Sequence, residues 1–145
     1  MDAVLSSPAV QLFGITYLIL VLKMAAVGWY TSFLRIRDKA FATPEDYRLQ
    51  GLTPKTQVHE DVERARRAHR NDLENILPYF GVGLLYALSH PSMTAARIYF
   101  IGFTAARVLH TVFYLASLQP YRTIAFGVAQ ILMFVMLLST FATLM

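Results

Sequence analysis

The sequence predicts an all-α integral membrane protein, built as a four-helix bundle. The chain of 145 residues is 56% hydrophobic and 15% charged, more apolar surface than a soluble domain of this size can bury. Four of its segments approach the length of about 20 apolar residues that a helix needs to cross a bilayer. One long polar segment separates the first of them from the second. We therefore expect a single transmembrane domain over residues 1–145.

The first predicted helix covers residues 10–36. Its apolar run is interrupted only by Lys23, and Trp29 and Tyr30 stand where aromatic side chains anchor a helix at the membrane interface. A cleavable signal peptide would need a basic start and a shorter apolar run. We therefore expect this segment to remain in the protein as a membrane span.

The second predicted helix covers residues 63–89. Its apolar part, from Ile76 to Leu88, is short for a span, so the helix reaches full length only if it begins among the preceding charges. Polar residues in that charged part recur at helical spacing and share one face. They are Glu63, Arg67, Arg70 and Glu74, with Asn71 beside them.

The third and fourth predicted helices cover residues 95–118 and 122–144. The third carries Arg97 near its start, whereas the fourth has no charged residue after its first position. Further along the third helix, three polar side chains are spaced by three and four residues, so they share a face that can look into the bundle. They are Arg107, His110 and Tyr114. Pro91 and Pro120 mark the short connections before each of these helices.

The connection over residues 37–62 is predicted to be a solvent-exposed loop, because Pro44, Gly51 and Pro54 break any continuous helix. Nine Lys and Arg residues lie between Arg35 and Arg70, and none lies in the tail before the first span. Since cytoplasmic loops carry the excess of basic residues, this loop is expected to face the cytosol and both termini the opposite side.

Several functional classes are disfavoured by composition. The chain has no cysteine, so any sulfur chemistry must use the thiol of a ligand. Its four histidines lie on different elements without the spacing of metal ligands, and we predict no metal site. The net charge is +4, but the basic residues are not interleaved with stacking aromatics, so we expect no nucleic-acid partner.

The ionisable groups in the second and third helices need partners or a function, because each charge at the membrane centre costs roughly 2.5–3.5 kcal/mol. Near the cytosolic helix ends they offer cations, a carboxylate, an amide and a phenol, which suits a charged, peptide-like ligand. Structural roles remain open for the same residues. Arg64 and Arg66 can serve as a positive-inside anchor, and polar groups can clasp helices together. His110 can be a core histidine and Tyr114 part of an aromatic belt.

Three stretches resemble one known family. VERARRAHRNDLENILPYFGVGLLY, KAFATPEDY and ARVLHTVFYLASLQPYR are similar to signatures of the MAPEG family, the membrane-associated proteins of eicosanoid and glutathione metabolism. DLENILPYFGVGLLY is closest to the microsomal glutathione transferase branch, whereas AHRND is shared with the prostaglandin E synthase branch. The resemblance covers nearly the whole chain from Lys23 onward.

The resemblance implies a homotrimer of four-helix protomers that binds glutathione at its subunit interfaces, near the cytosolic side. It also implies that Arg122 stabilises the glutathione thiolate and that Asp46 handles a proton. Thr123 stands where the synthase branch has a serine, and its hydroxyl can still donate to the sulfur, so it joins Arg122 and Asp46 as an expected catalytic residue. Phe126 stands where that branch has a tyrosine, and both departures favour the transferase. Matched position by position, the glutathione contacts are Arg35, Arg70, Asn71, Glu74, His110, Tyr114 and Arg122.

The function implied is that of a membrane-bound glutathione transferase, which activates glutathione as a thiolate and conjugates it to lipophilic electrophiles. Reduction of lipid hydroperoxides is a second activity of the same kind. The expected location is the endoplasmic reticulum membrane, as a multi-pass detoxification enzyme with its site toward the cytosol, and the mitochondrial outer membrane is a further one. The alternatives are a glutathione-dependent prostaglandin E synthase, a non-catalytic lipid-binding scaffold and a small channel, which would need polar residues along a whole span.

Overall fold

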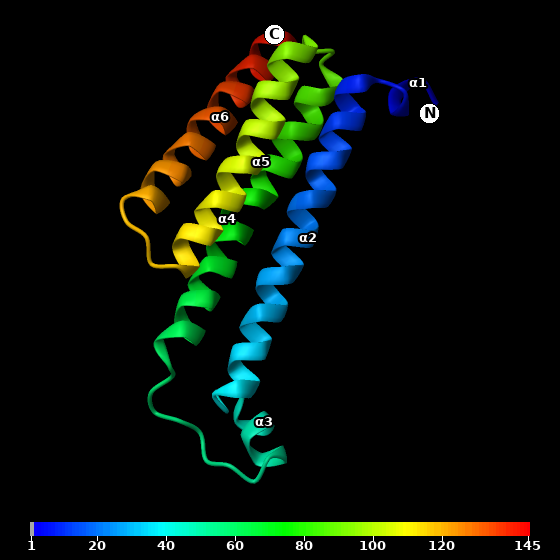
Figure 1. Ribbon diagram of the computed structural model, residues 1–145. Helices are drawn as coiled ribbons and strands as arrows, with labels where there is room; N and C mark the ends of the chain where they lie inside the picture. The colour runs from blue at the N-terminus through cyan, green and yellow to red at the C-terminus, as the bar shows by residue number, and fades with distance from the viewer. Residues whose placement is uncertain (1) are drawn as a thin grey trace.

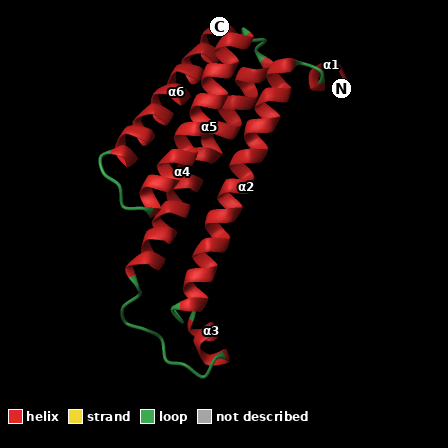
Figure 2. Cartoon of the chain, viewed as in Figure 1, coloured by secondary structure: helices red, strands yellow, loops and turns green. Residues whose placement is uncertain are grey.

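The computed structural model describes residues 2–145, and this part of the chain forms six helices and no strand (Figure 2). The all-α prediction is confirmed, but the count of four helices is wrong, because two short helices lie outside the bundle. The long helices are α2 (Pro8–Arg37), α4 (Glu60–Leu88), α5 (Met93–Leu115) and α6 (Tyr121–Leu144), and the short ones are α1 (Asp2–Leu5) and α3 (Pro44–Leu49).

The four long helices run side by side along one bundle (Figure 1). α2 packs along α4, and α5 packs along α6. Both chain termini lie at one end of the bundle, and α3 lies at the other end with the polar loop. Toward the α3 end, α2 and α4 extend beyond the ends of α5 and α6 (Figure 1). The first turns of α4 therefore lie along α2, and Leu115 at the end of α5 packs against the same apolar cluster as Val62 and Ala65.

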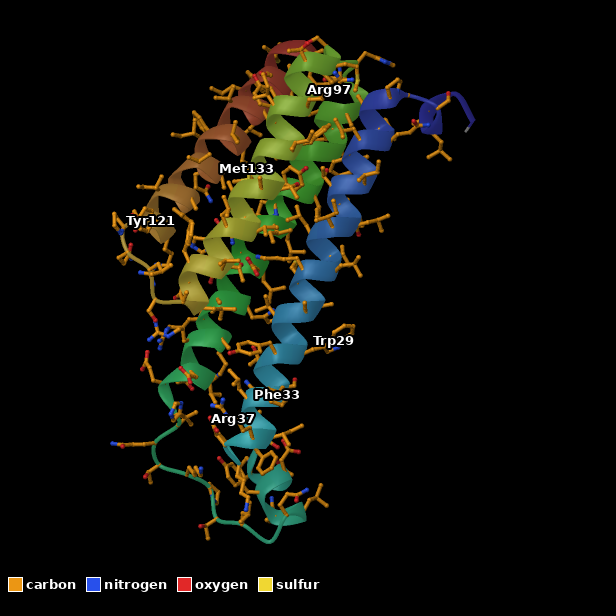
Figure 3. All side chains as sticks on the ribbon, in the orientation of Figure 1. Trp29, Phe33, Arg37, Arg97, Tyr121 and Met133 are labelled. Atoms are coloured by element: carbon orange, nitrogen blue, oxygen red, sulfur yellow. The ribbon has the colours of Figure 1, made fainter. Side chains whose placement is uncertain are left out.

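Three helices of the described chain, α2, α5 and α6, are long and apolar enough to cross a membrane. The prediction included α4 as a fourth span. The charged side chains in its first half make α4 too polar to be counted with the other three as a membrane-crossing helix. Large apolar side chains cover the outside of the bundle, and Trp29, 73% exposed, points away from it (Figure 3). These are the features of a membrane protein, whose outer surface faces lipid.

The polar loop contains a helix that the sequence prediction missed. Pro44, Gly51 and Pro54 were expected to break any continuous helix, and no short helix was predicted, but Pro44 occupies the first turn of α3, where a missing backbone N–H costs nothing. The Thr43 hydroxyl caps this turn by accepting a hydrogen bond from the Asp46 backbone N–H (3.4 Å). In the connection between α5 and α6, the predicted boundary also differs. α5 ends at Leu115 instead of residue 118, and Ser117 then turns the chain with a φ of 62°.

The loop is tied to the end of α2 by polar contacts of Asp38. The Arg37 guanidinium donates to both oxygens of this carboxylate (2.7 and 3.0 Å), which holds the pKa of Asp38 below its ordinary value. Lys55, from the far side of the loop, donates to the Asp38 backbone carbonyl. The polar loop is therefore held against the end of the helix from which it leaves.

The bundle core is aromatic where α2, α4 and α5 meet. The ring of Tyr79 stacks on that of Phe103 with centroids 4.0 Å apart, and Phe13 lies against Phe100 at 5.5 Å. The Tyr79 hydroxyl shares a hydrogen bond with Thr16 (3.1 Å), so its polar end is satisfied inside the core. This packing fixes the three helices relative to one another and leaves the polar groups of α4 and α5 at defined positions.

Candidate active site

A strongly basic pocket lies between α2 and the charged half of α4. We call it the α2–α4 pocket; its volume is about 530 Å³. It carries four arginines against a single glutamate, so its field is positive and suits an anionic ligand. The lining residues are Gly28, Thr31, Ser32, Arg35, Glu63, Arg66, Arg67, His69, Arg70 and Leu73.

Ion pairs along α4 hold most of these arginines on their own helix. Arg66 pairs with Glu63 at 2.7 Å, and Arg70 pairs with Glu74 at 2.9 Å. Arg35, contributed by α2, is half-buried and has no carboxylate within ion-pair distance among the described residues. Its charge is therefore the one most available to a ligand in this pocket.

A second polar pocket lies where the end of α5 meets the start of α6, beside α4. We call it the α5–α6 pocket; its volume is about 220 Å³. Six side chains line it, from three helices: Asn71, His110, Tyr114, Arg122, Thr123 and Phe126. It thus combines a cation, two hydrogen-bonding aromatic side chains, an amide and a hydroxyl in one small space.

Arg122 is held in the α5–α6 pocket by two contacts. Its guanidinium carbon lies 4.6 Å from the centre of the Tyr114 ring, a cation–π distance. With the Gln119 amide turned so that its nitrogen donates to Thr123 Oγ1 (3.0 Å), its oxygen accepts from Arg122 Nε (3.1 Å). No carboxylate within the described chain pairs with Arg122, so its charge remains free to stabilise an anion.

The structure divides the site residues expected from the sequence into two groups. Arg35 and Arg70 line the α2–α4 pocket, whereas five others line the α5–α6 pocket. Those five are Asn71, His110, Tyr114, Arg122 and Thr123. Within one chain the expected ligand contacts therefore face two different spaces.

Two expected residues line neither pocket. Glu74 is exposed on α4, where it accepts a hydrogen bond from Arg70 (2.9 Å). Asp46 lies in the first turn of α3, on the loop beyond the end of α2. A role for Asp46 in the chemistry therefore needs contact with a surface other than the α5–α6 pocket of its own chain.

A buried ionic network, centred on Asp72, joins α2, α4 and α5. Its carboxylate is fully buried and accepts from Lys23 of α2 and from Arg107 Nη2 of α5 (2.8 Å). Thr111 Oγ1 adds contacts of 3.4 and 3.5 Å to the two carboxylate oxygens. The same Arg107 Nη2 lies 2.8 Å from Asn71 Oδ1. Three helices are thus joined at one carboxylate, and the network touches a residue of the α5–α6 pocket.

The sequence prediction did not identify this network. Lys23 was noted only as an interruption of an apolar run, and Arg107 as sharing a face with His110. A signal was present, because two cations in separate apolar helices need an acidic partner at a similar depth. Asp72 is such an acid, adjacent to the predicted polar face of α4.

Comparison with known proteins places this geometry in a family. The model of the MAPEG family matches residues 13–142, which include all of α4 and α5 and most of α2 and α6. Microsomal glutathione S-transferase 1 of Rattus norvegicus is 46% identical over 115 residues, covering 76% of this chain and 74% of its own.

A second group of relatives, with a different name, matches this chain at similar sequence identity. Prostaglandin E synthase of Equus caballus is 42% identical over 130 residues, covering 89% of this chain and 85% of its own. The protein of the same name from Homo sapiens is 41% identical over 129 residues, covering 88% and 85%. The chain is thus similar to proteins of two activities, and the comparisons cover most of its length.

Proposed function

The chain belongs to the MAPEG family, and on this basis we propose that it is a membrane-bound glutathione transferase. It binds glutathione, stabilises its thiol as a thiolate and conjugates the sulfur to lipophilic electrophiles. The observation that carries the proposal is the free charge of Arg122, held beside His110, Tyr114 and Asn71 in one pocket.

The free energy that Arg122 must contribute to stabilise the thiolate is small. An alkyl thiol has a pKa of about 8.5, and lowering it by two units needs roughly 2.7 kcal/mol of preferential stabilisation of the thiolate. A charge-assisted hydrogen bond contributes about 1.5–3 kcal/mol, so one guanidinium beside the sulfur supplies most of this. A separate general base is therefore not required to form the nucleophile.

The rest of glutathione carries two carboxylates and an amine, which need charged partners. The α2–α4 pocket offers Arg35 and Arg70 to carboxylates, and Glu74 beside it can accept from an ammonium. We propose that the chain assembles as a homotrimer, in which the α2–α4 pocket of one protomer adjoins the α5–α6 pocket of its neighbour. The division of the expected contacts between two pockets supports this arrangement, because one tripeptide can then reach both.

The location of the pockets suits a reaction between a water-soluble and a lipid-soluble reactant. We place the α2–α4 pocket, which is lined by the charged half of α4, toward the cytosol, from which glutathione arrives. The apolar faces of α5 and α6 beside the second pocket are those of membrane spans, where lipophilic electrophiles concentrate. We propose a multi-pass protein of the endoplasmic reticulum membrane, with the mitochondrial outer membrane as a further location and lipid hydroperoxides as further substrates.

The second candidate function is glutathione-dependent isomerisation of an endoperoxide, as the name of the prostaglandin E synthases suggests. Their similarity to this chain over 89% of its length supports it, and so does the Thr123 hydroxyl in the α5–α6 pocket. Phe126 lines the same pocket and has no group that can donate a hydrogen bond. The transferase needs only a stabilised thiolate there, so we place it first.

An ultraviolet difference spectrum of the purified full-length protein with glutathione tests both functions. Thiolate absorption near neutral pH, followed by conjugation of a chlorinated dinitrobenzene, supports the transferase. Thiolate formation without conjugation, but with conversion of a prostaglandin endoperoxide, supports the second candidate. Absence of both binding and thiolate would contradict both and leave a lipid-binding scaffold.

A further inference from the structure

Arg107 lines neither pocket, yet it touches a residue that does. Its side chain is fully buried, and its Nη2 lies 2.8 Å from Asn71 Oδ1 and 3.3 Å from the Asn71 backbone oxygen. A guanidinium can only donate hydrogen bonds, so the group of Asn71 that faces it must be the amide oxygen. The orientation of the Asn71 amide is therefore determined from inside the protein.

This orientation decides what Asn71 offers to the α5–α6 pocket. With the oxygen held by Arg107, the amide nitrogen is the polar atom left to meet a ligand, and it can only donate. We propose that Arg107 is a positioning residue, which turns Asn71 so that its NH₂ group donates to a carboxylate or carbonyl oxygen of glutathione. The inference rests on the proposed function, and assigns to a buried side chain a part in selecting the ligand.

The position of Arg107 is itself fixed by the carboxylate next to Asn71. Asp72 accepts from Arg107 at 2.8 Å and also from Lys23, so the guanidinium is held between two consecutive residues of α4. Asn75 Nδ2 donates to the Asn71 backbone oxygen (2.6 Å), which Arg107 Nη2 also contacts (3.3 Å), so the same turn of α4 is held by two side chains. All contacts of Arg107 are made by Nη2, whose two N–H groups serve Asp72 and Asn71, while Nε and Nη1 have no hydrogen-bond partner in the described chain. Lysine at position 107 would keep the charge but lacks this planar, rigidly oriented NH₂ group.

A double-mutant cycle on the full-length protein tests whether Arg107 acts through Asn71. Arg107→Lys, Asn71→Ala and the double variant are compared for their KM for glutathione and their kcat with a chlorinated dinitrobenzene. We expect each single change to raise KM about tenfold, the effect of losing one hydrogen bond to a charged group, with kcat changed less than about threefold. The double variant should match Asn71→Ala alone; independent effects that multiply in KM would overturn the inference.

Two further variants separate positioning from a loss of structure. Thr111→Val removes another donor to Asp72 without touching Asn71, so its KM should stay within about twofold of the wild-type value. Asn71→Asp keeps an oxygen for Arg107 but replaces the donor by an acceptor. It should raise KM about tenfold or more, in protein whose assembly is checked by size-exclusion chromatography because the new carboxylate lies beside Asp72. A wild-type KM in Asn71→Asp would overturn the inference even if Arg107→Lys failed to assemble.

The outcome for the unaltered protein distinguishes this inference from the proposed function. If the wild-type protein does not bind glutathione, the proposed function is wrong and this inference with it. If it binds and conjugates glutathione but the two variants act independently, only the positioning role of Arg107 is wrong.

Discussion

Arg70 and Asn71 are consecutive on α4 but line different pockets. Adjacent residues of an α-helix point about 100° apart, so one helix can present polar groups to two sides of its bundle. Arg70 faces the space shared with α2, and Asn71 faces the space shared with α5 and α6. Within a single chain these two expected glutathione contacts do not meet in one pocket, which is why we propose that neighbouring protomers complete the site.

Replacing Arg70 by alanine distinguishes a ligand contact from a structural clasp. Its side chain is 82% exposed and pairs with Glu74, an arrangement that contributes at most about 1 kcal/mol to stability. A charged contact to a glutathione carboxylate is worth about 1.5–3 kcal/mol, so we expect KM for glutathione to rise about tenfold or more. The unfolding temperature should change little.

The matched control for Arg70 is Arg48→Ala. Arg48 is also exposed and also pairs with a glutamate of its own helix, Glu45 (3.6 Å), but it lies on α3 and lines neither pocket. Its KM should equal the wild-type value. If both variants raised KM alike, or if Arg70→Ala dissociated the assembly, the ligand contact would not be supported.

Replacing Arg122 by alanine should raise the pKa of the bound thiol. The cation favours the ionised sulfur, so its removal moves the midpoint of thiolate formation to higher pH, and the thiolate fraction at neutral pH falls. We expect a rise of one to two units, or about 1.4–2.7 kcal/mol. The measurement is thiolate absorption as a function of pH, in protein whose assembly is checked by size-exclusion chromatography.

Arg122→Lys is the variant to compare with Arg122→Ala, because it keeps the positive charge but loses the planar guanidinium with its fixed donors. It should recover part of the pKa shift that Arg122→Ala loses. An unchanged thiolate midpoint in Arg122→Ala would show that another group stabilises the sulfur.

The fold was predicted from the sequence where hydrophobic length alone decides it. Apolar runs of bilayer length predicted α2, α5 and α6, and helical spacing of charges extended α4 toward its observed start at Glu60. α3 was missed because Pro44 was taken as a breaker, although a proline in the first turn of a helix costs no hydrogen bond. Whether a proline breaks or begins a helix depends on its position in that helix, and the start of α3 was not predicted.

The candidate site was less accessible to the same reasoning. Helical spacing placed Arg107 and His110 on one face, but spacing within one helix does not say which residue of another helix is opposite. The pairing of Lys23 and Arg107 with Asp72 depends on the relative heights of three helices, which packing of the aromatic core determines. The division of the contacts between two pockets likewise follows from helix positions and not from spacing along α4.

Removing the Asp72 carboxylate should destabilise the protein strongly. Asp72→Ala leaves Lys23 and Arg107 as buried cations without their shared partner, and breaking a buried ion pair in this way costs about 3–5 kcal/mol. The control is Glu45→Ala, an exposed carboxylate whose loss should change stability by less than about 0.5 kcal/mol. Thermal unfolding in one detergent compares them, and equal unfolding temperatures would show that the buried pairs are dispensable.

Two glycines of α4 provide a matched pair that tests the core packing. A Cβ at Gly83 would lie 2.6 Å from Cε2 of Phe13, whose ring is confined against Phe100 at 5.5 Å. Overpacking of this kind costs about 1–3 kcal/mol, which outweighs the gain of up to about 1 kcal/mol from replacing a helical glycine by alanine. A Cβ at Gly81 meets nothing within 4 Å, so only the gain remains. We therefore expect Gly83→Ala to lower the unfolding temperature and Gly81→Ala to keep or raise it; a loss of the same size in both would mean that the Phe13 ring does not pack against α4 as described.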